Sequence, residues 1–264
     1  MKKSISGLFT VLTAIILFFQ LISCNESTDQ QMYYEIKIYS VPQPGQAESM
    51  DKYLADALIP ALHRAGINNV GAFKPIAADT ARFGKFVYLF IPYETADKYI
   101  NLVTLLENDT QYQQAGKDFL DAPVDNPPFA RYESIFMKAF KGMPALSVPS
   151  FNTPRGDRIY ELRDYESATE TKAAKKRDMF NNGEMDIFKK LGCNAVFYGQ
   201  VLAGSNMPDL MYMTTYQDMK THDEKWAAFR IDPDWVRMRG MEEYKNTTSK
   251  TTPFLLFPTD YSDF

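Results

Sequence analysis

Residue types that build metal centres and nucleic-acid interfaces are scarce in this sequence. Its 264 residues include only two histidines and two cysteines, and neither type forms a pair at the spacing of metal ligands. These absences predict no metal site. The formal net charge is −4 and no block of lysine or arginine occurs, so nucleic acid is not an expected partner. A glycine-rich phosphate loop is also missing.

The first 24 residues have the pattern of a targeting segment. Lys2 and Lys3 precede an apolar stretch, Leu8 to Leu21, which is too short to predict a membrane-spanning helix. The stretch ends in Leu-Ile-Ser-Cys, which resembles a bacterial lipobox. The resemblance implies a signal peptide at 1–23 and lipidation of Cys24. Two or three acyl chains would anchor the protein firmly, because each buried methylene contributes about 0.8 kcal/mol.

This N-terminus predicts a lipid-anchored protein of the cell envelope, and an ordinary cleaved signal peptide is the alternative. Residues 24–32 would form a polar tether. Asn25 is not the aspartate that retains lipoproteins on the inner membrane, so the resemblance implies the outer membrane, on its periplasmic or its surface face. The net charge would change from −4 to −6, because both lysines of the signal segment are lost. Cys193 would have no disulfide partner, so packed cores must supply the stability.

A repeat with a nearly constant offset runs through the rest of the chain. The sequence Tyr-Glu-Ile-Lys-Ile-Tyr at 34–39 returns as Tyr-Glu-Leu-Arg-Asp-Tyr at 160–165, a shift of 126 residues. Asp109 and Asp232 are related by a similar shift of 123. Markers in one order at one spacing indicate a duplicated domain. We therefore expect a first domain, a linker rich in proline and glycine, and a second domain, at 33–140, 141–157 and 158–264.

Within each copy the hydrophobic period changes in the same order. Alternating residues predict a half-buried strand at 34–39, and apolar residues at three- and four-residue spacing predict a helix from Met50 to Leu62. Three further strands and one helix are expected in the first copy, at 70–73, 86–91, 131–136 and 97–106. In the second copy, strands are expected at 159–165, 195–202, 210–216 and 253–257, and helices at 175–191, at 222–230 and from Asp232 onward.

The order strand, helix, strand, strand, helix, strand is that of a ferredoxin-like unit, whose antiparallel sheet carries helices on one face. One such sheet leaves its other face bare. We therefore predict an α+β fold of two tandem ferredoxin-like domains, packed as an intramolecular pseudo-dimer whose two sheets close into an α/β barrel.

Two motifs of the second copy resemble those of a known family. The strand Tyr-Glu-Leu-Arg-Asp-Tyr at 160–165 is similar to the opening strand of NIPSNAP domains, and Asp-Pro-Asp-Trp at 232–235 looks like their Asp-Pro-x-Trp signature. The first copy keeps the strand at 34–39 but has Asp-Thr-Gln-Tyr at 109–112. The resemblance implies the dimeric α/β-barrel superfamily, which includes small monooxygenases, EthD-like proteins and haem-handling enzymes. It leaves the activity open, because NIPSNAP domains have no agreed reaction.

The polar side of the first strand in each copy is the candidate site. Alternation places three residues of each copy on one face, namely Glu35, Lys37 and Tyr39, then Glu161, Arg163 and Tyr165. If the apolar side packs under the helices, these six side chains face the barrel interior and meet around the pseudo-twofold axis. Such a lumen would orient a small polar or aromatic ligand, with Arg163 holding a carboxylate through two hydrogen bonds. Alternatively, the acids and bases pair with one another and join the sheets.

The two histidines occupy different positions in the two copies. His63 lies late in the first helix of the first copy, and His222 opens the second helix of the second copy. No cofactor is predicted. Haem is the alternative, with His63 or His222 as its axial ligand, because the superfamily includes haem-handling proteins. Cys193 is predicted to be a buried, inert thiol. Several large side chains are predicted to pack helices, namely Trp226, Phe229, Trp235 and Met238.

These observations favour a membrane-anchored lipoprotein that binds a small molecule or a partner protein in or around the barrel lumen. A cofactor-free monooxygenase or isomerase is the alternative, with Tyr39, Tyr165, Arg163 or His222 in an aromatic lumen. Haem binding is a third hypothesis. Whether the chain is an enzyme stays open, as do the identity of its ligand and its association into a homo-oligomer.

Overall fold

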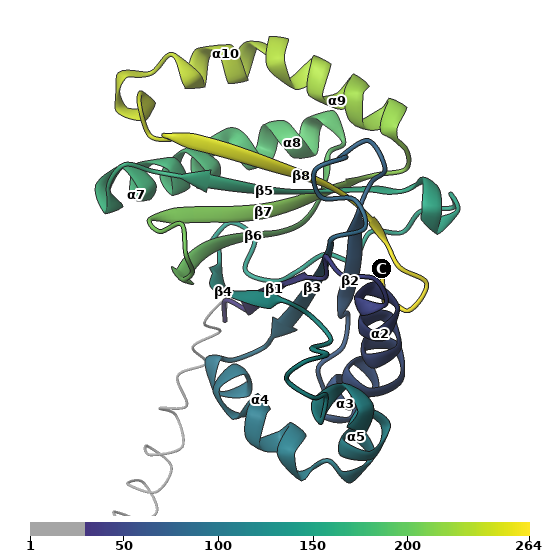
Figure 1. Ribbon diagram of the computed structural model, residues 1–264. Coiled ribbons are helices and arrows are strands. Elements are labelled where there is room, and N and C mark those ends of the chain that lie inside the picture. The colour runs from purple at the N-terminus through teal and green to yellow at the C-terminus, as the bar shows by residue number, and fades with distance from the viewer. Residues whose placement is uncertain (1–29) are drawn as a thin grey trace, which may run out of the picture. The chain divides into compact units, whose positions relative to one another are not determined.

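A closed barrel of eight strands forms the centre of the molecule. The computed structural model describes residues 30–264, of which residues 31–264 form one compact unit. Helices α7 to α10 cover one side of the barrel and helices α2 to α5 the other (Figure 1). The predicted signal peptide and Cys24 lie outside the described residues. Within the described part of the chain, no helix has the length and apolar character that a membrane crossing requires.

Each half of the chain contributes four strands. Those of the first half are β1 (Tyr33–Ser40), β2 (Gly71–Pro75), β3 (Phe86–Tyr93) and β4 (Arg131–Ala139). Those of the second half are β5 (Ile159–Glu166), β6 (Asn194–Ala203), β7 (Asp209–Tyr216) and β8 (Lys250–Pro258). The order around the barrel is β1-β3-β2-β8-β5-β7-β6-β4, and every neighbouring pair is antiparallel. The predicted α+β class and the closed α/β barrel are confirmed, whereas the predicted domain boundaries stay predictions.

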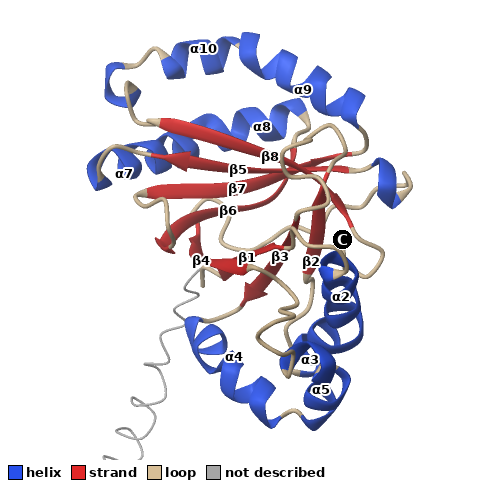
Figure 2. Cartoon of the chain, viewed as in Figure 1, coloured by secondary structure: helices blue, strands red, loops and turns tan. Residues whose placement is uncertain are grey.

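Helices follow the first and third strands of each half (Figure 2). The first half has α2 (Gln46–Tyr53), the π-helical η1 (Leu54–Leu58), α3 (Ile59–Arg64), α4 (Ala96–Asn108), α5 (Thr110–Ala115) and α6 (Lys117–Leu120). The second half has the 3-10 turn η2 (Arg155–Asp157), α7 (Glu170–Met179), the π-helical η3 (Phe180–Glu184), α8 (Met185–Leu191), α9 (Met219–Ile231), α10 (Pro233–Arg239) and the 3-10 turn η4 (Glu242–Tyr244).

Local sequence explains where the last helices of each half begin. The side chains of Asp109 and Asp232 accept hydrogen bonds from backbone amides in the first turns of α5 and α10. Each capping aspartate also pairs with a cation near the end of α3 or α8, at 2.7 Å for Arg64 with Asp109 and 2.7 Å for Lys190 with Asp232. The same cap and the same ion pair therefore fix the same helix in both halves.

The interior of the barrel is filled by apolar side chains from all eight strands. Tyr34 and Ile36 of β1 point into this core, as do Tyr160 and Leu162 of β5. The opposite faces of the two strands pack against helices, where Tyr39 and Tyr165 belong to two separate clusters. The prediction that the polar side of each strand faces the barrel interior is therefore wrong. Residues of both strand faces are buried. The sides that carry Glu35 with Lys37 and Glu161 with Arg163 face the helices, where polar partners offset the loss of hydration, while on the interior side of β5 Asp164 accepts a hydrogen bond from Asn206.

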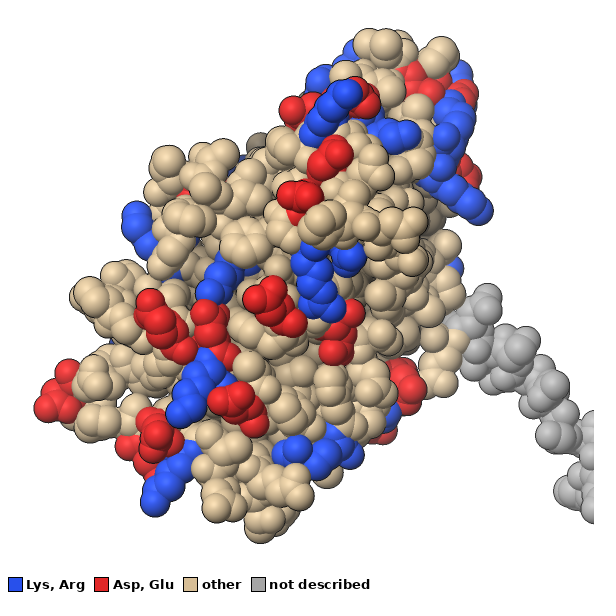
Figure 3. Space-filling model, turned by 90° about the vertical axis from the view of Figure 1, so that its right-hand side faces the viewer, with Lys and Arg blue, Asp and Glu red and all other residues tan. Residues whose placement is uncertain are grey.

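Charged side chains of both signs are interspersed on the surface. On the face shown in Figure 3, lysines and arginines alternate with aspartates and glutamates, and no broad patch of a single sign covers that face.

Candidate functional site

A pocket of about 610 Å³ lies between the helix-facing side of β5 and helices α7, α9 and α10. Its volume lies in the range of pockets that bind small molecules. Four residues predicted from the sequence line it, namely Glu161, Arg163, Tyr165 and His222. The structure thus brings together the second-half candidates and places them outside the barrel.

The buried carboxylate of Glu161 contacts three other side chains that line the pocket. Its Oε1 accepts a hydrogen bond from Arg163 Nη1 (2.5 Å), and its Oε2 lies 3.2 Å from His222 Nε2. The indole of Trp226 also donates to Oε2. Alternation along β5 places Glu161 and Arg163 on one face, while a spacing of four places His222 and Trp226 on one side of α9. Two secondary-structure elements therefore deliver three donors to one acid.

Charge and hydrogen bonding shift the pKa values of Glu161 and His222 in opposite directions. Burial would raise the pKa of Glu161, but the His222 hydrogen bond and the charge of Arg163 hold it below its usual range. Burial would lower the pKa of His222, but its hydrogen bonds to Glu161 and Asp223 raise it. Glu161 is therefore ionised at neutral pH, and the protonated form of His222 is favoured beyond that of a free histidine.

Arg163 has hydrogen-bonding capacity that the protein does not use. Its guanidinium lies 4.4 Å from the ring centre of Trp226 and 5.4 Å from that of Tyr165. Its Nε is buried and has no hydrogen-bond partner among residues 30–264. A buried donor without a partner costs about 1–3 kcal/mol. An acceptor atom of a bound ligand would remove that cost.

A second pair of opposite charges lines the same pocket. Lys176 Nζ lies 2.6 Å from Glu184 Oε2, and both side chains are almost fully buried. Burial raises the pKa of Glu184, although Lys176 opposes the rise. The Lys176 ammonium also lies 5.5 Å from the ring centre of Trp235. Glu184 belongs to the π-helical segment η3, and π-helical turns occur frequently at functional sites.

The corresponding region of the first half is filled by aromatic rings. Tyr53 stacks on Phe119 with ring centres 3.8 Å apart, and Tyr39 contacts Phe129 edge-on at 5.6 Å. At 126 residues before Lys176 and Glu184, the first half has the apolar Met50 and Leu58. In the second half, the interface between the first strand and its helices therefore contains a buried ion pair and a pocket, where the first half has packed rings.

The first-half candidates lie in this filled interface, apart from those of the second half. Glu35 accepts hydrogen bonds from Tyr93 (2.7 Å) and Ser134 (2.6 Å), and Lys37 Nζ lies 3.7 Å from its Oε1. Pairing within one half fits the alternative reading of these residues as structural. The prediction that Glu35, Lys37 and Tyr39 meet the second-half candidates in one lumen is wrong, because the packed barrel separates the two helix-covered faces.

The contacts of the two histidines do not favour haem ligation. His63 is exposed and its Nε2 lies 2.9 Å from Asp263 Oδ2. Both ring nitrogens of His222 contact carboxylates, at 3.2 Å for Glu161 and 2.9 Å for Asp223. Both ring nitrogens of His222 therefore already have partners, whereas the contact of His63 involves Nε2 alone, and haem binding stays a prediction. Among residues 30–264, no group of three or more acids, histidines or cysteines is arranged to hold a metal ion.

Sequence reasoning missed part of the pocket wall. Trp226, Phe229 and Trp235 were expected to pack helices, yet they line the pocket as well as packing on one another. Lys176 and Glu184 were not singled out at all. A comparison of the two copies gives the signal, because charged residues at 176 and 184 stand where the first copy has apolar ones. The prediction that Cys193 is buried is confirmed.

Comparison with known proteins gives a family match for part of the chain and a shared fold. The NIPSNAP family model matches residues 160–263. No curated protein matches the sequence. A solved structure of a candidate monooxygenase from Lactobacillus acidophilus is 10% identical, with a TM-score of 0.57 over 86% of this chain and 94% of that protein. Another candidate monooxygenase, from Fusobacterium nucleatum, is 7% identical, with a TM-score of 0.51 over 86% of this chain and 92% of that protein.

A NIPSNAP family protein from Agrobacterium tumefaciens is 17% identical and covers 40% of this chain and 98% of its own length, with a TM-score of 0.37. At identities of 10% and 7%, the likeness to the two candidate monooxygenases shows the fold alone and leaves the reaction open.

Proposed function

We propose that this chain, whose residues 160–263 match the NIPSNAP family model, binds a small aromatic anion in the pocket between β5 and helices α7, α9 and α10. The observation that supports the proposal is the buried group around Glu161. It presents Arg163, with one donor unpartnered, beside the rings of Trp226 and Tyr165.

The charges that line the pocket favour an anion. Arg163 and Lys176 lie inside, and two exposed arginines, Arg230 and Arg239, add positive charge at the mouth. Three acids line the same pocket, namely Glu161, Glu184 and Asp223, and the two buried ones already have cationic partners. The balance is positive, more so when His222 is protonated, and it attracts a carboxylate or phenolate. An aromatic body would stack on the tryptophan rings.

The binding test uses 2-naphthoate as an aromatic carboxylate probe and the full chain, measured by isothermal titration calorimetry. Arg163→Gln should weaken binding about 10- to 100-fold, because a hydrogen bond to a charged group contributes about 1.5–3 kcal/mol. Lys37→Gln is the matched control, since Lys37 occupies the same position on β1. Equal affinities of wild type and Arg163→Gln, or an equal loss in both variants, would refute the proposal.

The contact between Glu161 and His222 favours a second candidate, a cofactor-free enzyme that transfers protons to or from its ligand. The carboxylate fixes one ring nitrogen and stabilises the protonated imidazole, as it would for a general acid. Mass spectrometry of 2-naphthoate and related phenols after incubation distinguishes the two candidates. A compound that is returned unchanged supports binding, and one that is consumed by the wild type but not by His222→Gln supports catalysis.

We also propose that the two halves are tandem domains packed as an intramolecular pseudo-dimer. The two π-helical segments begin 126 residues apart, at Leu54 and Phe180, and the ion pair of Arg64 with Asp109 recurs as that of Lys190 with Asp232. Each half supplies its strands in the same relative order, 4-1-3-2 and 8-5-7-6. In this arrangement the first half completes the barrel and the second half carries the pocket.

Lipid attachment at Cys24, with a location at the outer membrane, is part of the proposal and rests on the N-terminal sequence. Metabolic labelling with an alkyne fatty acid tests it. The wild type should incorporate the label and Cys24→Ala should not; incorporation by both would refute lipidation at this residue.

A further inference from the structure

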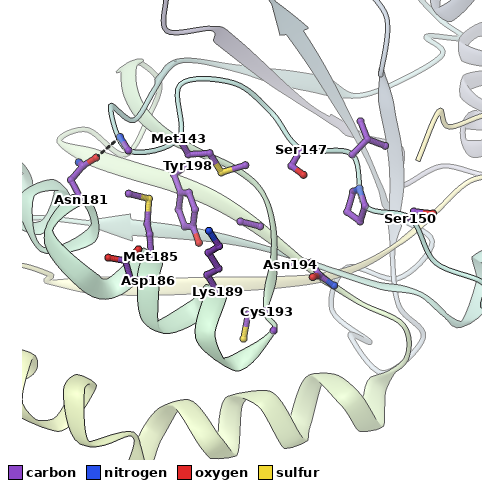
Figure 4. Close-up of a pocket in the computed structure, with 15 residues that line it drawn as sticks. Met143, Ser147, Ser150, Asn181, Met185, Asp186, Lys189, Cys193, Asn194 and Tyr198 are labelled. Atoms are coloured by element: carbon purple, nitrogen blue, oxygen red, sulfur yellow. Dashed lines mark hydrogen bonds between the residues drawn. The ribbon is translucent and has the colours of Figure 1, made fainter. Parts of the chain in front are cut away.

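The segment that joins the two halves forms one wall of a second pocket, of about 680 Å³. Residues 142–150 lie on one side, and helix α8 with the start of β6 on the other. Figure 4 shows Met143 on the joining segment, Met185 and Lys189 on α8, and the ring of Tyr198 between these elements. This pocket shares no lining residue with the pocket around Glu161.

Hydrogen bonds hold the joining segment in place over α8. The Gly142 amide donates to Asn181 Oδ1 (2.9 Å), and the Ser147 amide donates to the Val196 carbonyl (2.9 Å). The wall is therefore formed before any ligand arrives, which lowers the ordering cost of binding.

The lining of this pocket carries no net charge. Met143 and Met185 contribute thioethers, and burial raises the pKa of the Cys193 thiol to about 11, so that it is neutral. The charged lining residues, Asp186 and Lys189, are both exposed and have opposite signs. The lining of the pocket around Glu161, by contrast, has more cations than acids.

Tyr198 supplies an unused hydrogen-bond donor. The residue is only 2% exposed and lines the pocket, and its hydroxyl has no hydrogen-bond partner among residues 30–264. Burial raises its pKa, so the hydroxyl keeps its proton. The hydroxyl oxygen is not one of the fully enclosed polar atoms without a partner, so it is open to the pocket and can donate to a bound ligand.

We propose that this second pocket binds an uncharged, flat aromatic molecule that carries a hydroxyl or carbonyl oxygen. The Tyr198 hydroxyl donates to that oxygen, and the thioethers of Met143 and Met185 contact the ring, as methionine sulfur commonly does. Asn194 supplies a further neutral hydrogen-bonding group in the lining. The opposite charges of Asp186 and Lys189 give an ionised ligand no net attraction.

Two matched probes test the proposal with the full chain, 2-naphthalenemethanol as the neutral compound and 2-naphthoate as the anion. Cys193 reports occupancy, because it lines this pocket and not the other. Its alkylation by iodoacetamide at about pH 9.5, where a thiol of pKa about 11 is partly ionised, is followed by mass spectrometry of the Cys193 peptide, which separates it from Cys24. At ten times its dissociation constant the neutral probe should slow alkylation about tenfold, since only about a tenth of the pockets stay empty. The anion should leave the rate unchanged.

Tyr198→Phe keeps the ring and removes the hydroxyl, so the affinity for 2-naphthalenemethanol should fall about fivefold, the value of one neutral hydrogen bond. Tyr132→Phe is the matched control, because Tyr132 is half exposed on β4 and lies outside this pocket. No binding of the neutral probe at millimolar concentration, binding that leaves Cys193 alkylation unchanged, or equal protection by both probes would overturn the proposal. Unchanged affinity in Tyr198→Phe would overturn the assigned role of the hydroxyl. None of these outcomes depends on whether 2-naphthoate binds beside Arg163.

Discussion

The buried pair of Lys176 and Glu184 can be replaced by a pair that the same chain already contains. At the equivalent positions of the first half, Met50 and Leu58 are buried at 0% and 3% exposure. The double substitution Lys176→Met with Glu184→Leu therefore gives the second half the two apolar residues that the first half already buries at these positions. The single substitution Lys176→Met instead leaves the carboxyl of Glu184 without its cation.

The magnitudes follow from the cost of burying charge. Removing one member of a buried ion pair decreases the free energy of unfolding by about 3–5 kcal/mol. Replacing both members by apolar groups of similar volume is neutral or stabilises the protein by about 1–4 kcal/mol. We expect a loss of about 3 kcal/mol for Lys176→Met at pH 8, because protonation of Glu184 relieves part of the cost. The double variant should equal or exceed the wild type in stability.

The pH dependence of the single variant has a definite sign. Burial raises the pKa of Glu184 in the folded state above its unfolded value of ~4.3, so the folded state loses stability as the pH rises from ~4.3 through the folded-state pKa. Removal of Lys176 raises that pKa further. The loss in Lys176→Met should therefore be small at pH 4 and larger at pH 8.

Urea unfolding of the full chain at pH 4 and pH 8, followed by circular dichroism, measures all three proteins. A double variant that loses as much stability as Lys176→Met would contradict the assigned cost of an unpaired buried charge. A loss in the single variant that does not depend on pH would contradict it as well. The same double variant should bind 2-naphthoate more weakly than the wild type, because Lys176 lines the proposed anion pocket. Stability and binding would then change in different directions, as expected where charges are retained for function.

Two further predictions concern titrating groups. Glu161→Gln removes the carboxylate that stabilises protonated His222, so the midpoint of the His222 ring titration in NMR should fall; an unchanged midpoint would contradict the hydrogen bond. Burial and the neighbouring charge of Asp164 raise the pKa of Asp209 to about 7, above its unfolded value of ~3.9, so the folded state loses stability as the pH rises between these values. Asp209→Asn should therefore increase the free energy of unfolding by about 1–3 kcal/mol at pH 8 and change it little at pH 4; a gain that is equal at both pH values in urea unfolding would disprove the buried charge.

Features that depend on neighbouring residues were predictable from the sequence. Alternation at 34–39 and 159–165 predicted strands that the structure extends by one residue at most at each end. Asp232 followed by proline predicted the start of α10, because side-chain capping acts within one helical turn. The period of 126 residues predicted that both halves would follow one order of elements. The π-helical segments were not predicted, since a π-helical turn has no simple residue pattern.

The candidate site was predicted only in part. The polar sides of β1 and β5 contain Glu35 and Glu161 at equivalent positions, so both were predicted alike as ligand-binding residues. In the structure, Glu35 is paired within a filled aromatic interface, while Glu161 opens onto a pocket. Side chains from α6 and from the chain before β4 make this difference, and their contact with β1 depends on residues far apart in the sequence.

The sequence by itself determined the repeat, the order of strands and helices, and the set of polar residues on each first strand, because period and capping are local properties. The tertiary structure alone decided which side of each strand faces the barrel. Both sides are rich in buried residues, so their pattern does not distinguish an interior from a helix-covered face. Closure of the barrel makes that choice, because its interior is filled by large apolar side chains, and Glu161 with Arg163 is then placed under the helices beside a pocket.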